Sequence, residues 1–270
     1  MRTLLVFLIL ASSALGQVRN LSGWKQDVGG VKDRSFSAYR SGKIKALPPV
    51  VDLTNQMPKR VYDQGNIGSC TGEGIAALFS HYLWKESKRY IEPSSLFIYW
   101  NERNIEGTVN EDAGAMIRTG ITVISSIGTS TTKTWPFKES RWAMKPSKPA
   151  FIEATGLRSP VGLKVDNTDG RSIRVSVSDN CPVVFGMMLY SNIERITYWE
   201  PVLSIPKKGE RSIGGHCMLI VGYDDNKKLY KVRNSWSKLW GLNGYFFVPY
   251  SLIHNSRITG DCWTILPAKK

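Results

Sequence analysis

The chain has 270 residues, 42% of them hydrophobic, and 36 Lys and Arg against 22 Asp and Glu give a formal net charge of +14. That length and apolar fraction suffice for one large globular domain or two small ones and argue against a disordered chain. The basic residues are spread along the whole sequence instead of gathering on one helix or arm, which argues against a nucleic-acid-binding protein. The charge indicates only a general attraction to acidic surfaces or acidic substrates.

The first sixteen residues have the pattern of a secretory signal peptide. Arg2 precedes the apolar run 4–10, and residues 14–16, Ala-Leu-Gly, supply a cleavage site before Gln17. The run is too short to favour a membrane anchor. We therefore expect a secreted or otherwise extracytoplasmic protein that meets no membrane after signal cleavage, with a lysosome-like or vacuolar compartment as the alternative.

Residues 17–46 are rich in Gly, Ser, Lys and Arg and predict an irregular, extended segment, a short leader or propeptide-like stretch. Leu47-Pro48-Pro49 marks its end, and residues 50–53 predict a short extended piece. Beyond this boundary the pattern predicts a mainly helical lobe over 47–160 and a mainly β lobe over 161–270.

The helical part begins after the glycine-punctuated loop 64–69. Apolar residues then recur at the spacing of one helix face, namely Ile75, Leu78, Phe79, Tyr82 and Leu83. Pro93-Ser94-Ser95 predicts the cap of a second helix. A third helix is expected to start near Glu111-Asp112, because carboxylates suit a helix N-terminus.

Five apolar runs after residue 160 predict an antiparallel set of strands, at 182–189, 217–223, 229–233, 244–248 and 262–265. One further segment is ambiguous. Its apolar residues Ile173, Val175 and Val177 alternate with polar ones, which by period alone predicts a strand.

Cys70 is the candidate nucleophile. A thiol reacts as the thiolate, which a helix N-terminus favours, and Cys70 stands where the glycine-rich loop becomes a helix. Gln64, six residues earlier, could reach back over the loop and donate to an oxyanion beside the Cys70 N–H. The other three cysteines fit buried small hydrophobic residues, and at most two of them could form one disulfide: Cys181, Cys217 and Cys262.

A thiolate needs a general base, and the chain has three histidines to offer. His81 lies off the apolar face of the first helix and is expected at its exposed surface. His254 sits in a polar loop and is expected to be solvated. His216 opens a buried strand after Gly214-Gly215, which leaves room for a substrate backbone, although in isolation it fits a strand-edge histidine with a satisfied hydrogen bond equally well.

The segment after the next strand favours His216 as the base. A hairpin would bring Asn234 beside His216, where the amide oxygen could accept from the ring and fix its tautomer. Trp236 could shield that hydrogen bond from water.

These motifs occur in the order found in the papain-like (C1) family of cysteine peptidases, which the chain resembles over residues 47 to 266. The matching pieces are Gln64-Gly65, Gly68-Ser69-Cys70, Gly215-His216, Asn234-Ser235-Trp236 and Asn243-Gly244-Tyr245, with Val51-Asp52 at the usual start of the mature enzyme. The stretch from Tyr62 to Thr71 and the leader from Gly23 to Arg34 are similar to a bacterial and viral branch with a short N-terminal leader. Ile67, Thr71 and Glu73 depart from the cathepsin pattern.

The resemblance implies an α+β, papain-like two-lobe fold. A helical lobe would carry Cys70, an antiparallel β-barrel-like lobe would carry His216 and Asn234, and the active site would lie in the cleft between them. The resemblance also places a helix at 173–177.

In function, the resemblance implies a secreted cysteine peptidase, an endopeptidase, that hydrolyses peptide bonds through a thioester acyl-enzyme at Cys70, His216 and Asn234, with Gln64 at the oxyanion. It implies no metal or organic cofactor, a monomer, polypeptide substrates, and cystatin-like or other protein inhibitors as partners.

Three rival functions stay open: a catalytically inert papain-fold binding protein, a related thiol acyl transferase, and an exported structural protein that binds polyanions. Two features of the groove are expected as well. Residues 111–114 should help form its non-primed side, and Met187 or Met188 should line a pocket. Because Gly215 and not an acidic residue precedes His216, the sequence gives no reason to expect a preference for basic side chains.

Overall fold

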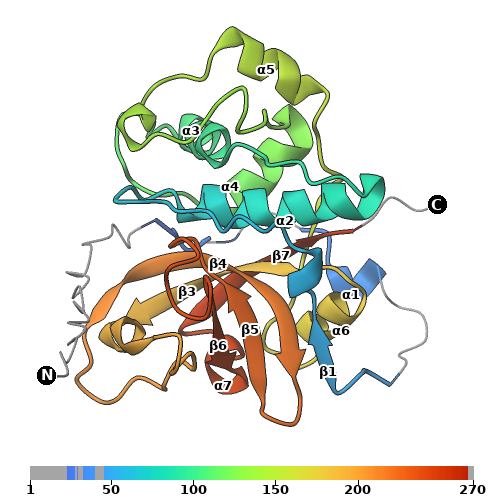
Figure 1. Cartoon of the computed structure of the whole chain (residues 1–270), viewed down its shortest axis with the longest axis vertical. Coiled ribbons are helices and arrows are strands. Elements are labelled where there is room, and N and C mark those ends of the chain that lie inside the picture. The colour runs from blue at the N-terminus through green and yellow to red at the C-terminus, as the bar shows by residue number, and fades with distance from the viewer. Residues whose placement is uncertain (1–22, 28, 30–32, 40–45, 267–270) are drawn as a thin grey trace, which may run out of the picture.

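The computed structural model describes residues 23–27, 29, 33–39 and 46–266. The predicted signal peptide and much of the leader lie outside these ranges. Figure 1 shows the helices of residues 95–155 on one side of the molecule and the sheet, with three short helices, on the other, and helix α2 (Cys70–Ser87) between them. None of the helices within the described ranges is long and apolar enough to cross a membrane.

The helical side is built from α2, α3 (Ser95–Glu106), α4 (Ile117–Thr122) with the π-helical turn η2 (Val123–Ile127), η3 (Glu139–Arg141) and α5 (Lys148–Thr155). Ser94 caps α3 as expected, since its Oγ accepts the Phe97 N–H at 3.2 Å. The third helix begins at Ile117, and the expected start near Glu111-Asp112 is wrong. Asp112 is used in a loop instead, where its carboxylate accepts the Gly68 N–H at 2.9 Å.

The sheet has seven antiparallel strands in the order β2-β7-β3-β4-β5-β6, with β1 paired to β4. Their bounds are β1 Val50–Asp52, β2 Gly162–Lys164, β3 Val183–Tyr190, β4 Ser212–Asp224, β5 Leu229–Arg233, β6 Tyr245–Pro249 and β7 Thr259–Ile265. The five predicted strands are confirmed, although β4 begins five residues and β7 three residues before the predicted start. β4 is the longest strand, and its first half carries His216 and Cys217.

Four short elements complete the sheet side, namely η1 (Thr54–Gln56), η4 (Ser191–Arg195), α7 (Tyr250–Ile253) and α6 (Ser172–Ser178). The strand predicted for 173–177 is wrong, and the helix implied by the family resemblance is found there. Asp169, three residues before the start of α6, accepts the N–H of Ser172, the first residue of the helix, at 2.8 Å. Ile173 and Val177, one helical turn apart, are both buried on one helix face, whereas Val175 between them is only partly buried.

The leader is not wholly irregular, because residues Phe36–Tyr39 form the short helix α1. Phe36 is buried and belongs to the main hydrophobic core. Ser35 forms an isolated parallel bridge with Lys164 of β2. This part of the leader therefore packs on the sheet side of the molecule.

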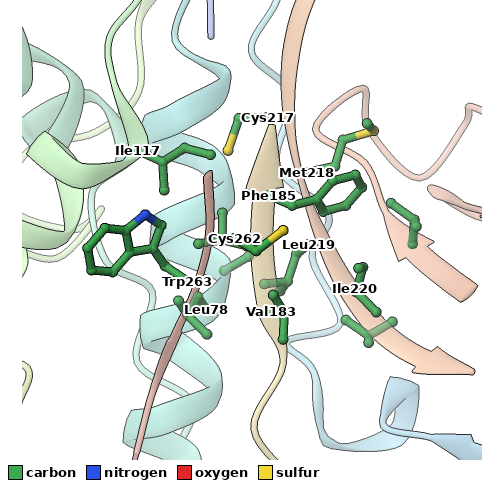
Figure 2. Close-up of a cluster of buried hydrophobic side chains, with 14 of the residues drawn as sticks. Leu78, Ile117, Val183, Phe185, Cys217, Met218, Leu219, Ile220, Cys262 and Trp263 are labelled. Carbon is green, nitrogen blue, oxygen red and sulfur yellow. The ribbon is translucent and has the colours of Figure 1, made fainter. Parts of the chain in front are cut away.

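The main core lies between α2 and the sheet. Figure 2 shows Leu78 of α2 and Ile117 of α4 beside side chains of β3, β4 and β7, Trp263 among them. A smaller cluster fills the helical side, with Leu96, Phe97, Trp135 and Ala150 among its members. All four cysteines are buried free thiols, which confirms the reading of Cys181, Cys217 and Cys262 as small core residues.

Candidate active site

Cys70 is the first residue of α2, so its side chain lies at a helix N-terminus, as the sequence predicted. Its Sγ accepts the backbone N–H of Cys217 at 3.3 Å. Cys217 follows His216 directly on β4, so this hydrogen bond brings the start of the helix and the histidine-bearing strand together. The two segments are 147 residues apart in sequence.

His216 and Asn234 are hydrogen-bonded as the sequence predicted. The ring Nε2 of His216 lies 2.8 Å from the Oδ1 of Asn234. Asn234 follows β5, which pairs with β4, and its N–H donates to the carbonyl of Gly244 at 3.0 Å. Trp236 lies over the pair with its ring centroid 5.0 Å from that of His216, so it screens the hydrogen bond from water.

Gln64 joins the two sides of the molecule. Its Oε1 accepts the Ser235 hydroxyl at 2.7 Å, and its Nε2 donates to the carbonyl of Ile67 at 3.0 Å. The backbone N–H of Gln64 also donates to the Ser235 carbonyl at 3.0 Å. The amide is therefore fixed at the loop that leads into Cys70.

Burial dominates the electrostatics around Cys70. It raises the pKa of the Cys70 thiol above its ordinary value, and the nearby Glu73 and Glu102 carboxyls act in the same direction. Burial also raises the pKa of Glu73 to about 8, although the Ser69 hydroxyl donates to it at 3.1 Å. Glu73 is therefore mostly neutral at neutral pH. Burial therefore opposes the thiolate form that the helix N-terminus favours.

The leader segment 23–25 covers Cys70. The N–H of Trp24 donates to the carbonyl of Gly215 at 3.1 Å on the sheet side. On the helical side, Ala115 accepts the Lys25 N–H at 3.0 Å and donates to the Gly23 carbonyl at 2.9 Å. The leader backbone is thus hydrogen-bonded both to β4 and to the segment before α4, and Cys70 is fully buried.

Two further groups hold the leader in place. Arg118 of α4 donates to Asp27 at 2.7 Å from its Nε and to Asp33 at 2.8 Å. Asp261 of β7 accepts the indole N–H of Trp24 at 3.0 Å. The sequence did not identify Arg118 or Asp261 as partners of the leader. Both are charged residues far from the leader in sequence, and no local pattern connects them with it. Residues 111–114 were expected to form one side of the substrate groove. They lie just before Ala115, whose backbone is hydrogen-bonded to Gly23 and Lys25.

The two remaining histidines are not where the sequence predicted them. His81 is buried, its Nε2 lies 3.1 Å from the Asn180 Oδ1, and burial lowers its pKa to about 4. His254 is half-buried and bonds the Tyr230 hydroxyl at 2.9 Å. Met187 is buried between its neighbours in the core, and a role for it or Met188 in a substrate pocket stays a prediction.

Comparison with known proteins defines the class. The family model described as "Papain family cysteine protease" matches residues 47–263. The chain belongs to the papain family and is a cysteine-type peptidase, with the papain-like arrangement of helices and antiparallel sheet.

Within the family, the chain is similar to viral and bacterial members. It is 34% identical over 245 residues to an "Uncharacterized peptidase C1-like protein L477" of Acanthamoeba polyphaga mimivirus, covering 86% of this chain and 79% of that one. Its fold is similar to that of xylellain, a cysteine protease from Xylella fastidiosa, with a TM-score of 0.82, 32% identity, and coverage of 95% of this chain and 100% of that chain. A digestive procathepsin L 3 of Tenebrio molitor, at 15% identity and a TM-score of 0.65, shares the fold over 93% of this chain and 76% of that chain.

Proposed function

We propose that this chain is a secreted, monomeric cysteine endopeptidase in which Cys70 is the nucleophile, His216 the general acid and base, Asn234 its positioning residue and Gln64 an oxyanion donor. The observation that carries the proposal is the pair of contacts described above. The His216 ring is bonded to Asn234 at 2.8 Å, and the next residue, Cys217, donates to the Cys70 sulfur at 3.3 Å.

The reaction follows from these contacts. Because Nε2 of His216 is bonded to Asn234, Nδ1 is the nitrogen that takes the Cys70 proton. The thiolate attacks the substrate carbonyl, and the oxyanion is held by the Cys70 N–H and the second N–H of the Gln64 amide. His216 then protonates the leaving amine as the C–N bond breaks and a thioester remains. Finally, His216 takes a proton from water, and the resulting attack releases the acid and the free thiol.

The leader acts as an inhibitory segment in this proposal. Residues 23–25 hold backbone hydrogen bonds on both walls of the cleft, and a fully buried Cys70 cannot receive a substrate. Burial also disfavours the thiolate. Displacement or removal of the leader is therefore required before catalysis.

Covalent labelling tests the proposal. An epoxide-type cysteine-protease inhibitor should label the full chain at Cys70, as mapped by peptide mass spectrometry, and faster when Trp24→Ala weakens the leader. Cys70→Ala should abolish both the adduct and peptide hydrolysis, whereas Cys181→Ala, at a buried thiol outside the site, should preserve them. Hydrolysis that survives Cys70→Ala would overturn the assignment.

The same preparations separate the rival functions. An inert binding protein would give neither adduct nor hydrolysis after the leader is weakened. An acyl transferase would join labelled peptides to an added amine in preference to water. Secretion has its own test, since the exported protein should begin at Gln17 on N-terminal sequencing.

A further inference from the structure

A small hollow lies beside Asn234, lined by α2, by β4 and by the end of β5. Its volume is about 10 Å³, close to the smallest space that holds one water molecule. Polar and charged side chains form much of its lining: Tyr62, Glu73, Arg233, Asn234 and Ser235. A water molecule in this hollow would therefore meet groups that can bind it.

Two of these polar side chains are bonded elsewhere. The Tyr62 hydroxyl donates to the carbonyl of Pro93 at 2.9 Å. The Ser235 hydroxyl donates to Oε1 of Gln64 at 2.7 Å. Both hydroxyl protons are therefore already used, and the chemistry of the hollow depends on the other three side chains.

Each of those three side chains has one atom without a hydrogen-bond partner among the residues that the structure describes: Oε2 of Glu73, Nε of Arg233 and Nδ2 of Asn234. The three residues are only 1%, 2% and 4% exposed, respectively. Buried polar groups in native proteins are satisfied by protein atoms or by ordered water. Two donors and one acceptor thus line a space the size of one water molecule, which has two lone pairs and two protons to match them.

The amide of Asn234 needs a partner at each of its ends. Its Oδ1 lies 2.8 Å from Nε2 of His216 and accepts the Ser235 N–H at 2.8 Å. Its Nδ2 carries hydrogens that no described residue accepts. An acceptor at Nδ2 would fix the rotation of the amide, and so keep Oδ1 in line with the ring N–H of His216.

Glu73 can be the acceptor at the far side of such a water molecule. Its Oε1 already accepts the Ser69 hydroxyl at 3.1 Å, which leaves Oε2 for the hollow. A neutral carboxyl still accepts through its carbonyl oxygen, so this contact does not require an ionised Glu73. Arg233 is held in place on the opposite side, because its Nη1 donates to the carbonyl of Pro58 at 3.0 Å.

We propose that the hollow binds one water molecule, which accepts hydrogen bonds from Asn234 Nδ2 and Arg233 Nε and donates one to Oε2 of Glu73. Through this water molecule, Glu73 is a positioning residue for the His216–Asn234 pair. The proposal rests on the proposed peptidase function. In the competing interpretation the hollow is empty, and Glu73 is only a core residue of α2.

A crystal structure of the full chain tests the water molecule directly. It should show one ordered water within about 2.7–3.2 Å of Glu73 Oε2, Arg233 Nε and Asn234 Nδ2. The water should remain in Glu73→Gln. It should be displaced in Ala77→Val, which adds two methyl groups to the wall of the hollow. An empty hollow in the original chain, in a map that shows other buried waters, would overturn the proposal.

Kinetics test the positioning role in the full chain with Trp24→Ala. The kcat is expressed per Cys70 that the epoxide labels, so that misfolded protein is not counted. Glu73→Leu removes the acceptor and should lower kcat about tenfold with KM unchanged, and Ala77→Val should do the same. Glu73→Gln keeps a carbonyl oxygen and should stay within about twofold of the original kcat. Glu86→Leu, at an exposed position of the same helix, is the matched control. An unchanged kcat in Glu73→Leu, or an equal loss in Glu73→Gln, would overturn the positioning role.

The ring N–H of His216 separates a failure of this proposal from a failure of the peptidase function. Its proton can be followed by NMR in the full chain, whether or not the chain cleaves peptides. Exchange of this proton with solvent should be about tenfold faster in Glu73→Leu and unchanged in Glu73→Gln. Equal exchange in Glu73→Leu and the original chain would overturn the proposal. If no variant cleaves any peptide while the exchange rates differ as expected, the peptidase function alone is contradicted.

Discussion

A Cβ placed on Gly23 would lie 2.6 Å from the Sγ of Cys70 and 2.5 Å from the carbonyl oxygen of Gly68. The leader thus passes so close to Cys70 that only a glycine fits there. This contact, with the hydrogen bonds of residues 23–25 to both walls, links the leader directly to the state of the thiol.

Substituting that glycine should open the site. Gly23→Ala forces the leader off Cys70, since two contacts would be far inside van der Waals range. We expect the labelling rate of Cys70 to rise about 5- to 150-fold, for a clash of roughly 1–3 kcal/mol. Ser37→Ala, on an exposed part of α1, is the matched control and should label at the original rate. Equal rates for the two variants would show that the leader does not restrict the thiol.

Acid should release the leader through Asp27. Burial alone would raise the pKa of Asp27, but the hydrogen bonds from Arg118 and from the Gly29 N–H outweigh it and lower the pKa below 3.8. A carboxyl with a depressed pKa stabilises the docked leader above its free pKa and loses that contribution as pH falls through the docked value. Labelling should therefore accelerate below about pH 4, the pKa of a free Asp.

Asp27→Asn isolates this contribution. The variant should label faster than the original chain at neutral pH and show a smaller further rise on acidification, measured by short acid pulses followed by labelling at one fixed pH. The charges of Lys164 and Asp261 also interact with Asp27. The labelling rates of the variant and the original chain are therefore compared at the same pH. An unchanged acid profile would contradict the assignment to Asp27.

Asn234→Ala should lower kcat/KM about 10- to 100-fold, because the His216 ring loses the acceptor that fixes its tautomer and orientation. The pH–rate profile should shift as well, which a purely structural loss would not produce. Asn226→Ala, at an exposed turn, is the matched control. An unshifted profile with normal kcat/KM would exclude a positioning role for Asn234.

Glu73 should make the free energy of unfolding depend on pH between its ordinary and its folded pKa. Its pKa is raised by burial from 4.5 to about 8, so the folded state holds a proton that the unfolded state releases in that range. As pH rises through this range, the free energy of unfolding of the original chain should fall by on the order of 1.4 kcal/mol for each unit by which the pKa is raised. Glu73→Gln keeps an acceptor for Ser69 and should lack this loss.

Denaturant unfolding at pH 5 and pH 8 measures the difference. Glu86→Gln, at an exposed position of the same helix, should follow the original chain at both pH values. Parallel pH dependence in the Glu73→Gln variant would show that Glu73 is ionised in the folded protein.

The sequence predicted the local features well because they depend on local chemistry. The apolar spacing after Cys70 and the Ser94 cap each lie within one helix, and α2 and α3 form there. At 173–177 the local pattern was insufficient, since Ile173 and Val177 share a face both in a strand and, four residues apart, in a helix. The helix start at Glu111-Asp112 failed because Asp112 binds Gly68, 44 residues earlier.

The leader's anchors could not be predicted from the sequence. Trp24 and Asp261 are separated by 237 positions, and no periodicity connects a short polar segment with the strand on which it docks. His81 fails in the same way, because its burial depends on Asn180, 99 residues away. Only the folded arrangement reveals such partnerships between distant residues.

The most direct measurement is epoxide labelling of the full chain and of its Trp24→Ala variant, followed by peptide mapping. The account predicts one adduct, on Cys70, that forms faster in the variant and disappears with Cys70→Ala. An adduct on Cys181, Cys217 or Cys262 in place of Cys70, or no adduct on Cys70 in the Trp24→Ala variant, would contradict it.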